Sequence, residues 1–197
     1  VAPLFSNTSR RAELVSGQEP FAIILGCSES RVPAELVFDQ GFGDLLLIRV
    51  GGNIVAPSQV GSVEFAASRF GTRLVVVMGH SQCGVVAAAM EELQGLGGRQ
   101  SRNLRAIVDR VRPSVETVLA SHRGADAEGL MRHAVRANVR ASVDHLRHGS
   151  ELLERLIQDD GLLVVGAEYS LETGAVDFFD GVPGPTGRAE RRRAGRG

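Results

Sequence analysis

Two cysteines and one histidine are the residues whose types and spacing best suit metal chemistry in this chain. Cys27 opens the stretch "CSESR", and His80 and Cys83 begin and end "HSQC". A His-x-x-Cys spacing places both side chains on one side of a helical turn. Two sulfurs and one nitrogen form the donor set of a catalytic zinc site, which keeps a fourth position for water or another group. A structural zinc would instead have four protein ligands.

Two other interpretations stay open at this level. Free cysteines are often simply small buried residues. A nucleophilic dyad, in which His80 activates Cys27 or Cys83, is the second alternative, although it leaves one cysteine without a role.

Glu29 and Arg31 follow Cys27 closely and are candidate catalytic residues. As an ordinary surface ion pair they would contribute under about 1 kcal/mol. In the functional interpretation, Arg31 fixes Glu29 so that its carboxylate accepts a hydrogen bond at the open metal position or ligates the metal directly.

Short apolar runs alternate with longer amphipathic segments along the chain. The runs predict buried strands of a parallel sheet, at 21–26, 45–50, 73–79 and 162–169. The longer segments predict helices, at 57–70, at 84–96 and as a long pair within 103–148. This alternation predicts an α/β fold with a central, mostly parallel sheet flanked by helices, and "YSLETGAVDFF" predicts a turn into an antiparallel edge strand.

The predicted sheet would bring the metal-binding residues together. In open α/β sheets, ligands bind at the carboxyl ends of the strands. Cys27 and the His80–Cys83 pair each follow such an end, so they meet if strands 21–26 and 73–79 are neighbours.

Length and composition indicate one domain. The chain has 197 residues, of which 43% are hydrophobic and 23% charged, as in ordinary globular proteins. We expect a single domain over residues 1–180 and a disordered Gly-, Pro- and Arg-rich tail over 181–197. A net charge of −1 gives no indication of a nucleic-acid partner.

The predicted location is cytoplasmic. No apolar stretch reaches the roughly 20 residues that a membrane span needs. Two cysteines in 197 residues favour a reducing compartment. The chain begins at Val1 and not at Met, which leaves open that it is the cytoplasmic domain of a longer protein.

These motifs resemble those of the β-class carbonic anhydrases. "CSESR" is similar to the family's Cys-x-Asp-x-Arg and "HSQC" to its His-x-x-Cys; "SVEFAA" and "ETGAVDF" match as well, and the resemblance extends from about Arg10 to Asp180. It implies Zn²⁺ held by Cys27, His80 and Cys83, and reversible hydration of CO₂ to bicarbonate and a proton. It also implies a homodimer or higher homo-oligomer, with each cleft lined from both subunits.

The resemblance further assigns residues of the substrate cleft. Gln18 matches a glutamine that hydrogen-bonds the substrate, and Leu46 and Phe65 match apolar cleft residues. Gly51 stands where the family commonly has a side chain, which would alter access to the cleft. No proton shuttle is assigned, and the remaining histidines are expected on the surface: His122, His133, His145 and His148.

Glu29 is the main departure, because the family has aspartate there. The extra methylene either preserves the role or lets Glu29 occupy the fourth metal position. The second case would give a catalytically impaired homologue acting as a binding or transporter-linked domain. A third alternative is a hydrolase of a related small molecule such as CS₂. Arg49 matches the arginine of a bicarbonate site found in some relatives, but that site needs a tryptophan and the chain has none, so we predict no such regulation.

Overall fold

A five-stranded sheet forms the centre of the computed structural model, which describes residues 8–98, 100–122, 124 and 126–184. The strands run in the order β2-β1-β3-β4-β5. Their bounds are β1 Ala22–Gly26, β2 Leu45–Arg49, β3 Leu74–His80, β4 Leu163–Tyr169 and β5 Val176–Asp180. The first four are parallel and β5 is antiparallel to β4. The predicted fold class, including the antiparallel edge strand, is therefore confirmed.

Burial along the strands follows their place in the sheet. Every residue of β1 is buried, as are most residues of β3 and β4, because layers cover both faces of these inner strands. The edge strands β2 and β5 are only partly buried.

The helices follow capping signals in the sequence. Their bounds are α1 Thr8–Glu13, α2 Ala34–Val37, α3 Pro57–Arg69, α4 Gly84–Leu93, α5 Arg102–Ser121, α6 Ala127–His148 and α7 Glu151–Asp159, with a short 3₁₀ turn, η1, at Gly51–Asn53. Pro57 opens α3, where its missing N–H costs nothing. Ser101, Asp126 and Ser150 cap α5, α6 and α7 respectively, and the side-chain oxygen of each accepts a hydrogen bond from a backbone N–H in the first turn of its helix. The pattern analysis found α3 to α6 but missed α1, α2 and α7.

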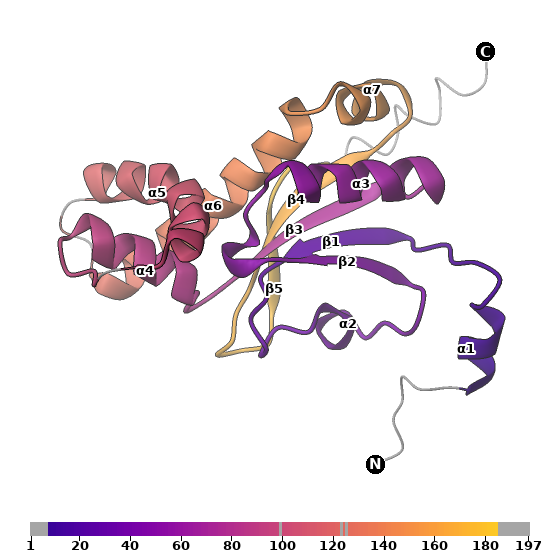
Figure 1. The fold of residues 1–197 in the computed structure, drawn as a ribbon, viewed down its shortest axis with the longest axis horizontal. Helices are drawn as coiled ribbons and strands as arrows, with labels where there is room; N and C mark the ends of the chain where they lie inside the picture. Colours follow the sequence, from indigo (N-terminus) through magenta and orange to yellow (C-terminus); the bar gives the residue numbers. More distant parts are fainter. Residues whose placement is uncertain (1–7, 99, 123, 125, 185–197) are drawn as a thin grey trace.

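The candidate site lies at the end of the sheet where the inner strands have their carboxyl ends. Helices α3, α6 and α7 lie over one face and α2 over the other, while α4 and α5 lie beyond the carboxyl ends of the inner strands (Figure 1). Cys27 and Cys83 belong to the apolar cluster between these strand ends and helices α4, α5 and α6. Among the described residues, no helix has both the length and the apolar content that a membrane span requires. Residues 185–197 of the predicted tail lie outside the described part of the chain.

Candidate metal centre

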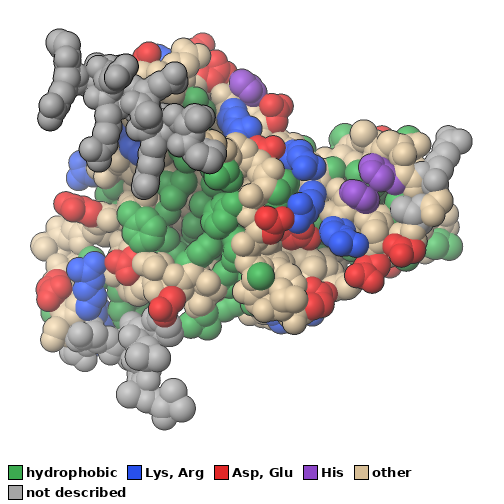
Figure 2. Space-filling model, turned by 180° about the vertical axis from the view of Figure 1, so that it is seen from behind, with side chains coloured by type: hydrophobic (Ala, Val, Ile, Leu, Met, Phe, Trp, Pro, Cys, Tyr) green, Lys and Arg blue, Asp and Glu red, His purple; other side chains and the backbone are tan. Residues whose placement is uncertain are grey.

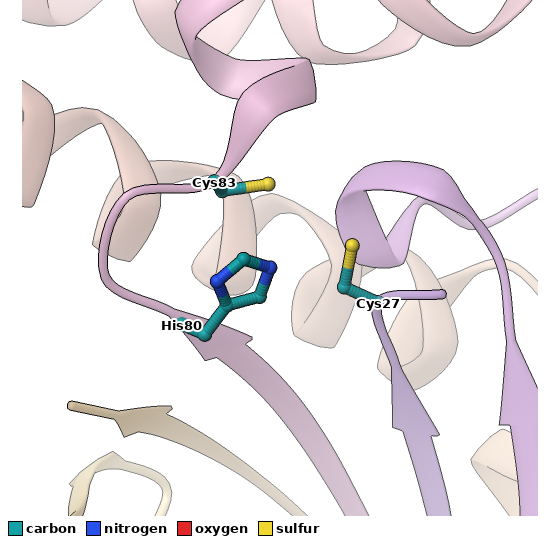
Figure 3. Close-up of side chains that lie close together, drawn as sticks. All are labelled: Cys27, His80 and Cys83. Atoms are coloured by element: carbon teal, nitrogen blue, oxygen red, sulfur yellow. The ribbon is translucent and has the colours of Figure 1, made fainter. Parts of the chain in front are cut away.

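The three predicted metal ligands converge at the carboxyl ends of β1 and β3. These strands are parallel neighbours, with Gly26 opposite Met78, which meets the condition set in the sequence analysis for the three residues to come together. Cys27 directly follows β1, His80 ends β3, and Cys83 precedes α4. One donor atom from each lies within 4.8 Å of those of the other two, and all three residues are buried. Figure 3 shows both sulfurs and a ring nitrogen directed into the same gap.

The hydrogen bonding of His80 leaves one nitrogen for a metal. Nδ1 lies 2.8 Å from the carbonyl oxygen of Ser81, which can only accept, so Nδ1 carries the ring proton. Nε2 is buried without a hydrogen-bond partner. Buried polar atoms are rarely left unsatisfied, and an imidazole whose other nitrogen donates to a carbonyl is the usual arrangement of a metal-ligating histidine. The donor set therefore fits a metal ion.

The pKa values of the two cysteine thiols are shifted in opposite directions. A hydrogen bond from Cys83 lowers the pKa of Cys27 to about 4 against the effect of burial, with smaller contributions from His80 and the backbone of Gly52. The pKa of Cys83 is raised, because it is the donor to Cys27 and is itself buried. Burial lowers the pKa of His80, but the nearby Cys27 and the Ser81 carbonyl together raise it above its usual value. Cys27 is thus held as a thiolate, the form that binds metals.

The turn η1 supplies a backbone donor to this thiolate. The Gly52 amide donates to Cys27 Sγ at 3.3 Å. Gly52 has φ +70°, and a Cβ at this position would lie 2.9 Å from Val85 Cγ1, so glycine is required for both reasons.

Two buried side chains of α6 bond the carbonyls of this turn. Asn138 Nδ2 donates to Gly52 O at 2.7 Å, and Ser142 Oγ donates to Asn53 O at 2.9 Å. The sequence analysis missed both residues. The available signal was a pair of polar side chains one helical turn apart on the otherwise apolar buried stripe of α6.

Glu29 is held by Arg31 and is not one of the three converging donors. Arg31 Nε and Nη2 donate to the two carboxylate oxygens at 2.9 and 3.0 Å. These bonds lower the pKa of Glu29 to about 2, so the carboxylate is ionised at neutral pH.

Arg49 braces the same loop from β2. Its Nε donates to the Cys27 carbonyl at 3.1 Å and its Nη2 to the Glu29 carbonyl at 2.6 Å. The guanidinium predicted to match a bicarbonate-binding arginine is therefore engaged by two backbone carbonyls.

Comparison with known proteins assigns the chain to a family. Residues 22–176 match the family model described as carbonic anhydrase. Carbonic anhydrase 2 of Mycobacterium tuberculosis is 36% identical over 176 residues, covering 88% of this chain and 81% of that protein. The β-carbonic anhydrase CafA of Aspergillus fumigatus superimposes with a TM-score of 0.79 at 25% identity, covering 95% of this chain and 88% of that one. The chain belongs to the β-class carbonic anhydrases.

Two further relatives extend the comparison. The carbonic anhydrase of Mycolicibacterium smegmatis is 34% identical, covering 86% of this chain and 79% of that protein. A chain from the crystal structures of two tetrameric β-carbonic anhydrases of Sordaria macrospora shares the fold, with a TM-score of 0.75 at 24% identity, over 88% of this chain and 87% of that one. Family membership supports CO₂ hydration as the activity of this carbonic anhydrase, and the cluster of Cys27, His80 and Cys83 fits its metal site.

The residues assigned to the substrate cleft are dispersed within one chain of this carbonic anhydrase. Leu46 and Phe65 line one hollow, of about 410 Å³, between β2 and α3. Gln18 lines a second, of about 590 Å³, near α1. Neither lining includes the three metal-binding residues. Gly51 lies in η1 next to the site, where a Cβ would meet Val85 at 3.4 Å.

The histidines outside the cluster lie at or near the surface, as expected. His133, His145 and His148 are exposed, and His122 is half-buried and stacks on His133 with ring centroids 4.1 Å apart.

Proposed function

We propose that this β-carbonic anhydrase carries out zinc-dependent, reversible hydration of CO₂, with Cys27, His80 and Cys83 holding the metal. The observation that carries the proposal is the convergence of these three buried donors, with His80 Nε2 unpaired. When bound, zinc lowers the pKa of a coordinated water to about 7 and so supplies a nucleophile at neutral pH. Two sulfurs and one nitrogen leave the fourth position for that chemistry.

Glu29 and Arg31 act together beside the fourth position in this proposal. Two charge-assisted bonds from Arg31 fix the direction of the carboxylate and keep it ionised, so it can only accept hydrogen bonds. Glu29 could reach the metal only by giving up these two bonds to Arg31. The geometry therefore favours an active enzyme over a homologue whose site is closed by Glu29.

The proposed functional unit is a homodimer or a larger homo-oligomer. Gln18, Leu46 and Phe65 lie apart from the metal-binding residues of their own chain, which is expected if they complete a cleft in the partner. Phe65 is 58% exposed and Val15, beside Gln18, is 86% exposed. Figure 2 shows apolar side chains gathered over a broad area of one face, and large exposed apolar areas mark interaction surfaces. Light scattering on the purified chain tests this, and a monomer at micromolar concentration would contradict it.

Stopped-flow CO₂ hydration tests the activity. Native zinc-loaded protein, Glu29→Asp and Cys83→Ser would be compared at a pH well above the value of about 7 expected for metal-bound water. We expect rapid hydration by the native chain, comparable hydration by Glu29→Asp, and loss of both zinc and activity in Cys83→Ser. A silent native chain together with an active Glu29→Asp variant would show that the glutamate has impaired the enzyme.

A further inference from the structure

We propose that Asn138 is a positioning residue for the Cys27 sulfur. By holding the carbonyl of Gly52 from α6, it keeps the Gly52 amide on the sulfur and so sets how strongly Cys27 holds the metal. This inference rests on the proposed metal site and adds to it a group that touches neither metal nor substrate.

The contacts form a continuous, buried chain. Asn138 is 2% exposed, and its Nδ2 donates to Gly52 O at 2.7 Å. The N–H of Gly52 then donates to Cys27 Sγ at 3.3 Å. One helical turn along α6, Ser142 donates to the next carbonyl, that of Asn53, at 2.9 Å. Two side chains of one helix therefore hold two successive carbonyls of η1.

The turn needs such anchors because its backbone is strained. Gly52 has φ +70° and Asn53 has φ +44°, so two successive residues adopt left-handed conformations. A left-handed backbone conformation costs Asn53 free energy because, unlike glycine, it has a Cβ. Such conformations persist only where the surrounding structure imposes them.

The residue type at position 138 has no packing explanation. Its neighbours on the buried stripe of α6 are mostly apolar: Ala134, Val135, Val139, Val143 and Leu146. Burying an amide without a partner costs about 1–3 kcal/mol, so an aliphatic side chain would suit the stripe better. The bond to Gly52 accounts for an asparagine there.

The bond to sulfur explains why this position bears on metal binding. An N–H donor restricts the directions of a thiolate's remaining lone pairs and so keeps the sulfur aimed at the metal; without it the sulfur must be ordered when the metal binds, which weakens binding. The same bond draws electron density from the sulfur, which alters the sulfur-to-metal absorption. In a buried site with low dielectric, this effect is larger than in water. Groups that orient and polarise a ligand in this way commonly change metal affinity 10- to 100-fold when removed.

The test compares zinc affinity in full-length variants by competition with a chromophoric chelator. Asn138→Ala removes the donor to Gly52, and Ser142→Ala is a milder change to the same turn. Ser150→Ala is the matched control, because Ser150 is also buried and donates to a side chain, that of Glu64, away from η1. We expect about 10- to 100-fold weaker binding for Asn138→Ala, a smaller loss for Ser142→Ala, and native affinity for Ser150→Ala.

A second readout separates positioning from general loss of stability. In cobalt-substituted protein, the sulfur-to-metal absorption band reports electron donation from the thiolates, and it should shift in Asn138→Ala but not in Ser150→Ala. The Gly52 amide should also exchange with solvent faster in Asn138→Ala.

Several outcomes would overturn the inference. Native affinity and an unshifted band in Asn138→Ala would do so while leaving the proposed metal site intact. If Asn138→Ala does not fold, native affinity in Ser142→Ala would overturn it instead. An equal loss of zinc affinity in Ser150→Ala would show that the effect comes from lowered stability and not from positioning of the sulfur. Failure of the native chain to bind zinc would refute the proposed site itself.

Discussion

Replacing Gly52 by alanine should destabilise the fold by about 2–5 kcal/mol. Part of this cost comes from the backbone, because φ at Gly52 is +70° and a left-handed conformation costs a residue with a Cβ about 1–2 kcal/mol. The rest comes from overlap, because the new Cβ would lie 2.9 Å from Val85 Cγ1 and overpacking a core costs about 1–3 kcal/mol.

Gly71 provides a control that separates the two costs. Its φ is +67°, but a Cβ there would have nothing within 4 Å. Gly71→Ala should therefore lose only the backbone part, about 1–2 kcal/mol. Adding Val85→Ala to Gly52→Ala removes the overlapping methyl groups and should recover part of the difference.

Urea unfolding followed by circular dichroism measures these free energies. A chelator and a single protein concentration keep metal binding and assembly from shifting the apparent stability. Equal losses for Gly52→Ala and Gly71→Ala would refute the reasoning, because they would show that the close approach of η1 to α4 imposes no packing constraint.

Three further perturbations test other contacts. Arg31→Met should raise the pKa of Glu29 from about 2 toward its ordinary 4.5 in a carboxyl NMR titration, and an unchanged pKa would contradict the assignment. Because folding lowers this pKa, the pair stabilises the fold above pH 4.5, and that stabilisation is lost as the pH falls toward 2. Arg136→Met removes the ion-pair partner of the buried Glu168 of β4 and should lower the free energy of unfolding in urea by about 1–3 kcal/mol. Arg132→Met is the control, because Arg132 makes no ion pair among the described residues, and should change that free energy by under about 0.5 kcal/mol; equal losses in the two variants would show that the ion pair does not stabilise the fold. Bicarbonate should not inhibit CO₂ hydration through Arg49, because two backbone carbonyls engage that guanidinium; inhibition that disappears in Arg49→Ala would show the opposite.

The sequence predicted the parts of the fold and site that depend on local pattern. The apolar runs placed the four parallel strands to within a few residues, because the inner strands among them are buried on both faces. The antiparallel edge strand was predicted instead from the turn within "YSLETGAVDFF". The spacing of His80 and Cys83, together with the rule that ligands bind at strand ends, predicted that Cys27 would join them if strands 21–26 and 73–79 were neighbours. Glu29 and Arg31 are two residues apart in the sequence, so their ion pair could also be predicted from it.

The parts that the sequence did not predict depend on contacts between distant segments or on weak local signals. Asn138 lies 86 residues from the Gly52 carbonyl that it bonds, and no pattern within α6 identifies that partner. Arg49 was matched to a ligand site, whereas its bonds to two carbonyls depend on the register of β2 beside β1. Helix α2 has four residues, too few to show a helical period. Helix α7 did carry a signal, a Ser150 cap followed by an amphipathic segment, which was overlooked.

The most direct test of the account is a crystal structure of the zinc-loaded protein at neutral to alkaline pH, with the metal located by its anomalous scattering. The account predicts one zinc per chain, bound by Cys27 and Cys83 at about 2.3 Å and by His80 Nε2 at about 2.0–2.1 Å. It further predicts that the fourth position holds no protein atom and that Glu29 remains paired with Arg31. A Glu29 oxygen at about 2.0–2.2 Å from the zinc would contradict the claim of an open site.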